Sequence, residues 1–316
     1  MIYLLYALVA VGVVGLSVKA SDYIDLLDRK TSLSGAFLGG IMLSAVTSLP
    51  ELFTSISATM LIHEPDMCLG NILGSDLFNL AALSACILIF ARSFRGAKLS
   101  HSHQVVNVLV FCCYGVMILN WLGILRFEIF SINIASAVIV LLYILSVRFL
   151  SADNGAAEAE EEQESSPLTV QQIVIRFVAV SIGIIVLSIV LTYTTDGIAE
   201  RLHLGEGLAG ALFLGIATSL PELSSTVALF RIKNFDIAFG NIVGSNMFNF
   251  IIMAVVDILY IRGTVYDFSD PQTVTLLLCG TVALVFMALL MRSRNWFSRF
   301  VCPAGIVLCY AAFLLV

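Results

Sequence analysis

Residues 44–51 read SAVTSLPE, and residues 215–222 read GIATSLPE. Each copy is followed by a second shared segment, GNILGSDLFN at 70–79 and GNIVGSNMFN at 240–249. The copies of the first segment lie 171 positions apart and those of the second 170, so the register agrees to within one residue. The chain therefore contains an internal repeat whose unit covers roughly half of its length.

The composition excludes a water-soluble domain. Of the 316 residues, 59% are hydrophobic and only 12% are charged, whereas soluble domains carry about 25% charged residues. The mean hydropathy of +1.01 indicates that lipid is the solvent for most of the surface. The 7 cysteines are odd in number and lack metal-ligand spacing, so they are interpreted as small apolar core residues. These features predict a protein that crosses the membrane several times.

The apolar runs predict an all-α integral membrane protein. A helix needs about 20 apolar residues to cross the bilayer core. A signal peptide carries basic residues before its apolar run, and none precedes the first run here, so the first run is interpreted as a membrane span. Ten transmembrane helices are expected, at 2–19, 33–61, 67–91, 104–124, 128–147, 171–194, 207–230, 237–261, 272–291 and 297–316.

The repeat and the helix count together predict two inverted halves. Residues 151–169 are acidic and contain Gly, Ser and Pro, which is typical of a linker. The linker separates a first five-helix repeat, 1–150, from a second, 170–316. The motif regions lie at about 39–79 and 210–249. Because five crossings reverse the direction of the chain, the second copy must be inserted upside down, as in secondary transporters.

The charges predict the orientation and exclude nucleic acid as a partner. The net charge is -6, and six of the 22 acidic residues lie in the linker. The other 16 acidic residues equal the 16 Lys and Arg in number, so the rest of the chain is neutral overall. No basic patch for nucleic acid remains. All Lys and Arg except Arg126, Arg201 and Arg262 fall on one side of the expected topology, which is therefore predicted to be cytoplasmic. This places the linker 151–169 in the cytoplasm and both termini outside the cell membrane.

Two acidic residues lie where a carboxylate is costly. Glu51 and Glu222 fall well inside apolar spans that contain no Lys or Arg. An ionised carboxylate in the bilayer core is unfavourable by several kcal/mol unless a counter-charge compensates it. The simplest missing counter-charge is a bound cation.

The residues next to Glu51 and Glu222 are suited to bind a cation. Pro50 and Pro221 lack a backbone N–H and crowd the carbonyl four residues back, so the helix should kink or unwind there. Carbonyls released in the stretches 44–47 and 215–218 become oxygen ligands. One helical turn before the glutamates, hydroxyls stand on the same face, and they belong to Thr47, Ser48, Thr218 and Ser219.

The second motif predicts the opposite wall of the site. Ser75 and Asn79 are four residues apart, as are Ser245 and Asn249, so each pair presents a hydroxyl and an amide on one helical stripe. The neighbouring glycines form a small-residue seam that allows close helix packing. An all-oxygen site disfavours soft transition metals and suits Ca²⁺, which takes six to eight oxygens. Two carboxylates balance one Ca²⁺ or two Na⁺, so Ca²⁺ in competition with Na⁺ is favoured.

The paired TSLPE and GNxxGSxxxN segments resemble the alpha-repeats of the sodium/calcium exchanger family, prokaryotic-type, within the cation/Ca²⁺ antiporter superfamily. The resemblance implies a Na⁺/Ca²⁺ antiporter with alternating access, in which both ions compete for a midplane site to extrude Ca²⁺. By the resemblance, Glu51 and Glu222 would be the shared carboxylates. The other implied site residues are the side chains of Ser48, Ser75, Ser219, Ser245, Asn79 and Asn249 and the carbonyls of Ser44, Thr47, Gly215 and Thr218.

The chain departs from the family pattern at some positions. Val46 and Ala217 stand where the family often has Gly. Some members carry Asp where Asn249 stands, and in the K⁺-dependent branch that Asp is associated with K⁺ use, so two Asn residues favour K⁺ independence. Asp76 replaces the commoner Asn, and it either adds charge near the cavity or has a packing role.

Several alternatives stay open on the residues alone. A Ca²⁺/H⁺ exchanger would use the same two glutamates as proton carriers, and a K⁺-dependent exchanger or a passive cation channel would need similar ligands. An intramembrane hydrolase is disfavoured because all four His lie in predicted loops and no HExxH is present. The chain is therefore predicted not to be an enzyme. It needs no cofactor beyond the transported Ca²⁺ and Na⁺, and no obligate protein partner is evident.

Overall fold

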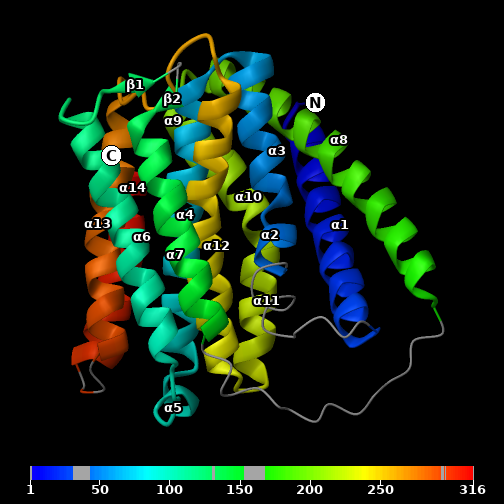
Figure 1. The fold of residues 1–316 in the computed structure, drawn as a ribbon, viewed down its shortest axis with the longest axis vertical. Coiled ribbons are helices and arrows are strands. Elements are labelled where there is room, and N and C mark those ends of the chain that lie inside the picture. Colours follow the sequence, from blue (N-terminus) through cyan, green and yellow to red (C-terminus); the bar gives the residue numbers. More distant parts are fainter. Residues whose placement is uncertain are drawn as a thin grey trace.

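A computed structural model describes residues 2–30, 43–129, 132–152, 168–292, 295 and 297–315. In these ranges the chain is a bundle of helices that run mostly along one direction (Figure 1). Most of the predicted linker, 153–167, lies outside the described residues. The long apolar runs of the sequence account for this architecture, because only helices satisfy every backbone hydrogen bond within one segment in lipid.

The first half contains both unbroken and interrupted helices. Residues 31–42, at the start of the second predicted span, lie outside the described part. The π-helical turn η2 continues α3, and a two-stranded antiparallel hairpin precedes α7. The elements are α1 Ile2–Lys30, α2 Leu43–Thr47, α3 Leu49–Ser57, η2 Ala58–Ile62, α4 Pro65–Ile89, α5 Ala91–Phe94, α6 His101–Trp121, β1 Glu128–Ile129, β2 Ile132–Asn133 and α7 Ile134–Ala152.

The second half follows the same order. A long first helix is succeeded by an interrupted segment, a long unbroken helix and a final antiparallel pair. The elements are α8 Val170–Leu202, α9 Glu206–Ala209, η3 Gly210–Gly215, α10 Ile216–Thr218, α11 Leu220–Arg231, α12 Phe235–Leu259, α13 Pro271–Arg292, η4 Phe297–Val301 and α14 Cys302–Leu315. The turns η3 and η4 are π-helical.

Each of the ten predicted spans contains helix, and the all-helical membrane fold is confirmed. Among the described residues, seven helices are long and apolar enough to cross a membrane, or eight if the bent pair Glu206–Thr218 and Leu220–Arg231 forms one span. Leu49–Ile62 and Ile134–Phe149 are shorter apolar helices. The count of ten transmembrane helices is therefore not confirmed and stays a prediction.

The predicted fifth span begins later than expected, since residues 128–129 and 132–133 form two paired strands instead of helix. Asn133 ends the hairpin and caps α7, because its Oδ1 accepts the Ala135 N–H at 2.9 Å. The Asn133 N–H donates to Oδ2 of Asp257 at 2.9 Å, and the same oxygen accepts the Ser136 hydroxyl at 2.6 Å. A buried carboxylate on α12 thus fixes the hairpin and the start of α7.

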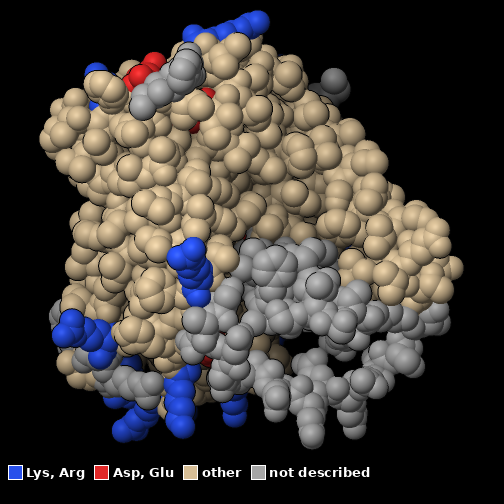
Figure 2. All heavy atoms as spheres, viewed as in Figure 1, with Lys and Arg blue, Asp and Glu red and all other residues tan. Residues whose placement is uncertain are grey.

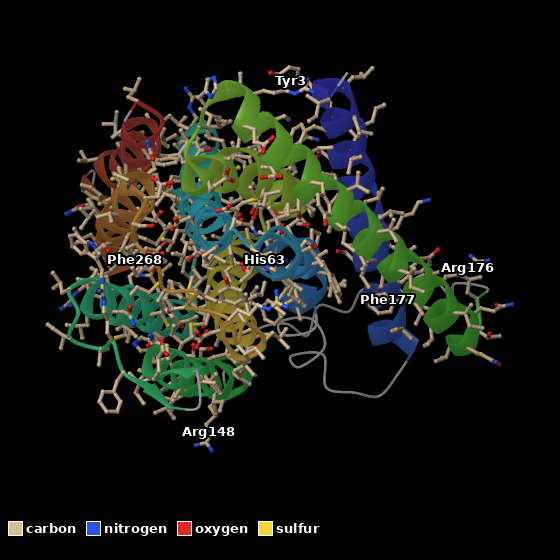
Figure 3. All side chains as sticks on the ribbon, turned by 90° about the horizontal axis from the view of Figure 1, so that it is seen from above. Tyr3, His63, Arg148, Arg176, Phe177 and Phe268 are labelled. Atoms are coloured by element: carbon tan, nitrogen blue, oxygen red, sulfur yellow. The ribbon has the colours of Figure 1, made fainter. Side chains whose placement is uncertain are left out.

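Two helices lie outside the rest of the bundle. α1 extends to Lys30 and α8 to Leu202, both further than predicted, and the two pack along each other on one side of the molecule (Figure 1). Seen from above, Arg176 of α8 lies at the outer edge of this pair, Phe177 lies further in beside α1, and His63 lies nearer the middle (Figure 3). In α1 and in α8, only 17% of the residues in the membrane-spanning stretch are buried. The corresponding share is 72% in α4 and 67% in α12, so α4 and α12 form the centre of the bundle.

Small residues bring α4 directly against the segment from α9 to η3. A Cβ on Gly74 would lie 2.5 Å from the Cα of Ala211. A Cβ on Gly70 would collide with the carbonyl of Gly207, and one on Gly210 with the carbonyl of Met67. The small-residue seam predicted for the second motif is therefore present on α4, and it joins the first half to the interrupted helix of the second.

The charged side chains lie mainly at the ends of the bundle. On the face in Figure 2, the middle is almost free of charge, and Lys and Arg gather at the lower end, where Figure 1 places α5. Arg92, Arg95 and Lys98, in and after α5, are exposed. This distribution agrees with a membrane-embedded body.

Candidate ion-binding site

Both copies of TSLPE interrupt a helix at the same serine. Ser48 separates α2 from α3 with φ -90° and ψ 12°, and Ser219 separates α10 from α11 with φ -88° and ψ 2°. Pro50 and Pro221 occupy the first turn of the helix that follows, where a missing N–H costs nothing. In the second half, the two segments are bent by 46°. The predicted breaks are therefore confirmed, and the π-helical η3 adds a further irregularity of the kind found at functional sites.

The two glutamates are buried, and each faces hydroxyl groups of the opposite half. Glu51 is 1% exposed and Glu222 is 0% exposed. Ser219 donates its hydroxyl to Oε1 of Glu51 at 3.2 Å, and Thr218 lies beside the same carboxylate. In the mirrored arrangement, the side chains that lie beside Glu222 belong to Thr47 and Ser48. The two carboxylates are also close enough to interact electrostatically.

Most oxygens around this pair lack a donor. Among the described residues, Oε2 of Glu51 and both carboxylate oxygens of Glu222 are buried with no partner within hydrogen-bond distance. No Lys or Arg is buried in the described part of the chain. Native proteins leave few buried polar groups unsatisfied. Further buried acceptors without a partner there are Oγ of Ser48 and Ser245 and Oδ1 of Asn79 and Asn249.

The helices α4 and α12 form the second wall and connect the halves. Ser75 of α4 donates its hydroxyl to the carbonyl of Gly215, at the end of η3, at 3.2 Å. Asn79 donates its amide to Oδ1 of Asn246 at 3.0 Å, and Asn246 donates to the backbone carbonyl of Asp76 at 3.1 Å. Residues of both second motifs therefore meet at the centre of the bundle.

Asp76 is a third buried carboxylate at this centre. It is 0% exposed, and its Oδ1 accepts the amide of Asn249 at 2.9 Å. Its Oδ2 has no hydrogen-bond partner in the described ranges, and the side chains of Glu51 and Tyr114 lie near it. The sequence left the role of Asp76 open between added charge near the ion site and packing, and the structure places its side chain beside Asn249 and Glu51.

Two asparagines were missed by the sequence reasoning. Asn246 bridges α12 to α4, as described above. Asn71 donates its amide to Oγ of Ser55 at 2.8 Å, to Oγ1 of Thr54 at 3.0 Å and to the backbone carbonyl of Glu51 at 3.3 Å. For Asn71, the available signal was the recurrence of Asn at the same place in both GNxxGS copies. Asn246 offered no such signal, because its counterpart in the first copy is Asp76.

The remaining predicted ligands lie around the breaks. Ser44 and Thr47 are in α2 and Thr218 ends α10, so their carbonyls flank the two interrupted turns; the side chain of Ser44 lies outside the described residues. No three His, Cys, Asp or Glu side chains in the described ranges converge in a way that could hold a metal. A cation here would therefore depend on the carboxylate pair together with neutral oxygens, which suits hard ions such as Na⁺ and Ca²⁺.

Known proteins resemble this chain over almost its whole length. The family described as "Sodium/calcium exchanger protein" matches residues 1–152 and 173–316. The H⁺/Ca²⁺ exchanger CAX has a similar fold, with a TM-score of 0.71 and 13% identity over 99% of this chain and 87% of CAX. The sodium-calcium exchanger NCX_Mj, soaked with Na⁺ and Sr²⁺, has a TM-score of 0.62 and 20% identity over 99% of both chains. The human sodium/potassium/calcium exchanger 4 is 46% identical over 54 residues, 17% of this chain and 9% of that protein.

Proposed function

This chain belongs to the sodium/calcium exchanger protein family, and we propose that it is an antiporter that extrudes Ca²⁺ in exchange for Na⁺. One observation carries the proposal. Glu51 and Glu222 are both buried, with hydroxyls of the opposite half beside them and no buried Lys or Arg in the described residues. A carboxylate pair in that setting needs a cation.

The residues present fit Na⁺ and Ca²⁺ as alternative substrates. Two carboxylates neutralise one Ca²⁺ or two Na⁺, and the neutral oxygens around them supply the six to eight ligands that Ca²⁺ takes. Glu51 and Glu222 would be shared by both ions. The other proposed ligands are the side chains of Ser48, Ser75, Ser219, Ser245, Asn79 and Asn249 and the carbonyls of Ser44, Thr47, Gly215 and Thr218.

Coupling follows from the cost of an empty site. If the inverted halves rock around the central site, each access state must pass through an arrangement closed to both sides. Without a cation, that arrangement leaves two unpaired carboxylates in a low-dielectric interior, which is unfavourable. Movement is therefore favoured only with Na⁺ or Ca²⁺ bound, and one ion is exchanged for the other.

H⁺ is the one alternative to Na⁺ as the coupling ion that a specific observation favours. A similar fold is found in an H⁺/Ca²⁺ exchanger as well as in a sodium-calcium exchanger. The same two glutamates would carry protons in a Ca²⁺/H⁺ exchanger. Na⁺ is favoured here by the TSLPE motifs and by the local identity to a sodium/potassium/calcium exchanger.

Reconstituted flux separates these functions. Purified protein in liposomes is given a Na⁺, an H⁺ or a K⁺ gradient one at a time, with the membrane potential clamped, and uptake of radiolabelled Ca²⁺ is followed. The proposal predicts uptake with the Na⁺ gradient alone and none with H⁺ or K⁺. Uptake driven by H⁺ without Na⁺ would instead show Ca²⁺/H⁺ exchange, and Ca²⁺ entry without any opposing gradient would show a channel. Protein-free liposomes are the control.

The orientation is part of the same proposal. We place the linker 151–169 in the cytoplasm and both termini outside the cell membrane, because nearly all Lys and Arg lie on one predicted side. Protease cleavage of the linker in inside-out but not in right-side-out vesicles tests this placement.

A further inference from the structure

The two halves use an equivalent asparagine differently. In the first half, the Asn71 amide holds α4 to α3 through the Ser55 and Thr54 hydroxyls and the backbone carbonyl of Glu51. Asn71 is 0% exposed, so these bonds form away from water. The backbone of Glu51 is thereby fixed relative to Ser75, one turn further along α4.

The matching residue of the second half makes none of these bonds. Asn241 occupies the position of Asn71 in the second GNxxGS copy, and Thr226 the position of Ser55. Asn241 is 7% exposed, yet neither of its amide atoms has a hydrogen-bond partner in the described part of the chain, and Thr226 Oγ1 has none there either. Three unsatisfied polar atoms on facing helices of a native protein require an explanation.

A second pair of equivalent residues shows the same asymmetry. Ser75 donates its hydroxyl to a carbonyl of the opposite half, whereas Oγ of Ser245, its counterpart, has no partner among the described residues. At these two matched positions the halves carry the same side chains, Asn and Ser, but the first half has donor hydrogen bonds that the second half lacks in the described residues.

We infer that Asn71 and Asn241 are conformation-dependent positioning residues, each holding the glutamate-bearing helix of its own half in one of the two access states. Alternating access moves one inverted repeat against the other around the site. On this inference the two halves exchange their local arrangements, so the bonds of Asn71 break in the opposite state and a bond from Asn241 to Thr226 forms. The structure shows the state in which Glu51 is held and Glu222 is released. The inference rests on the proposed exchange function, since it needs two access states.

Hydrogen–deuterium exchange of the full chain in lipid nanodiscs tests this directly. Asn71→Ala removes the bonds of the described state, so the population shifts to the other one. Deuterium uptake is expected to rise over residues 49–57 and to fall over 220–231. Asn241→Ala is expected to give the reverse, although Asn241 makes no hydrogen bond in the structure. The ratio of the two uptake rates should move by roughly 5- to 30-fold, the factor that corresponds to about 1–2 kcal/mol.

A purely structural role predicts a different pattern. Asn71→Ala would then raise deuterium uptake over residues 49–57 and leave uptake over 220–231 unchanged, and Asn241→Ala would change uptake over neither segment. Either result overturns the inference. Thr226→Val removes the partner of Asn241 without breaking a bond of the described state, so it must reproduce Asn241→Ala even if Asn71→Ala does not fold. Asn107→Ala is the matched control, because Asn107 is equally buried but bonds to Leu284 of α13 at 3.4 Å, away from the site.

The result is separable from that of the flux experiment. Hydrogen–deuterium exchange measures deuterium uptake in each half without any ion gradient. Opposite changes in the uptake of the two halves therefore support the inference whichever ion drives Ca²⁺ transport. Conversely, Na⁺-driven uptake together with no opposed shift would leave the proposed function standing and remove the role of the two asparagines.

Discussion

The hydroxyl of Ser219 donates to Oε1 of Glu51 at 3.2 Å, although 168 positions separate the two residues. Ser219 is the serine at which the helix of the second half breaks, and Glu51 is the buried carboxylate of the first half. Ser48 lies beside Glu222 in the mirrored position, although no hydrogen bond joins the two side chains in the described residues. The carboxylates are thus surrounded by groups from both halves, and neither half alone forms the site.

Removing the Ser219 hydroxyl should weaken ion binding. A hydrogen bond to a charged group contributes about 1.5–3 kcal/mol, and Ser219→Ala also deletes a proposed ligand. The Ca²⁺ concentration for half-maximal uptake should rise about tenfold or more, measured as Na⁺-driven uptake in proteoliposomes. Ser188→Ala is the control, since Ser188 is a buried serine of α8 whose Oγ has no partner in the described residues. Equal affinities for the two variants would exclude the role of Ser219.

Neutralising Asp76 tests whether it belongs to the ion cavity. In Asp76→Asn, the new side-chain oxygen still accepts the Asn249 amide, so the fold should be retained while one negative charge is lost. The affinity for Ca²⁺ should fall about tenfold, the effect of roughly 1.4 kcal/mol of charge interaction.

The contrasting variant is Asp257→Asn, which neutralises a carboxylate that already has its donors from Asn133 and Ser136. This variant should lower thermal stability and leave the Ca²⁺ affinity unchanged. If Asp76→Asn behaves in the same way, Asp76 has a packing role only.

The seam of small residues should be sensitive to a single methyl group. Gly70→Ala places a Cβ onto the carbonyl of Gly207, and overpacking of this kind costs about 1–3 kcal/mol. The midpoint of thermal unfolding in detergent should drop by several degrees. Gly115→Ala in α6 meets nothing within 4 Å, so its midpoint should stay within error of the unmodified protein. Similar midpoints for both variants would mean that α4 and α9 do not pack this closely.

The repeat made much of this architecture predictable. Two copies of TSLPE, each with proline before a glutamate, indicated broken helices at fixed places, because proline removes a helical hydrogen bond whatever surrounds it. The long apolar runs predicted the helices for a similar reason, since lipid leaves the backbone no alternative.

Other features depend on contacts between distant residues. The sequence does not show that Thr218 and Ser219 approach Glu51 rather than Glu222, because that depends on how two halves pack. The paired strands at 128–129 and 132–133 were expected to be helical, and the second strand is held by Asp257, more than 120 residues later in the chain. The difference between Asn71 and Asn241 could not be predicted, since both copies carry the same residue and a hydroxyl residue at the facing position, Ser55 or Thr226.

The claim that Glu51 and Glu222 share a cation is tested most directly by equilibrium binding of radiolabelled Ca²⁺ to the purified protein, with and without Na⁺. If the two glutamates share a cation, the unmodified protein binds Ca²⁺ and releases it as Na⁺ is added. Glu51→Gln and Glu222→Gln, each folded by thermal unfolding, should both lose this Na⁺-sensitive binding, while Asp257→Asn should keep it. Unchanged Ca²⁺ binding in either glutamine variant would mean that Glu51 and Glu222 do not share a cation.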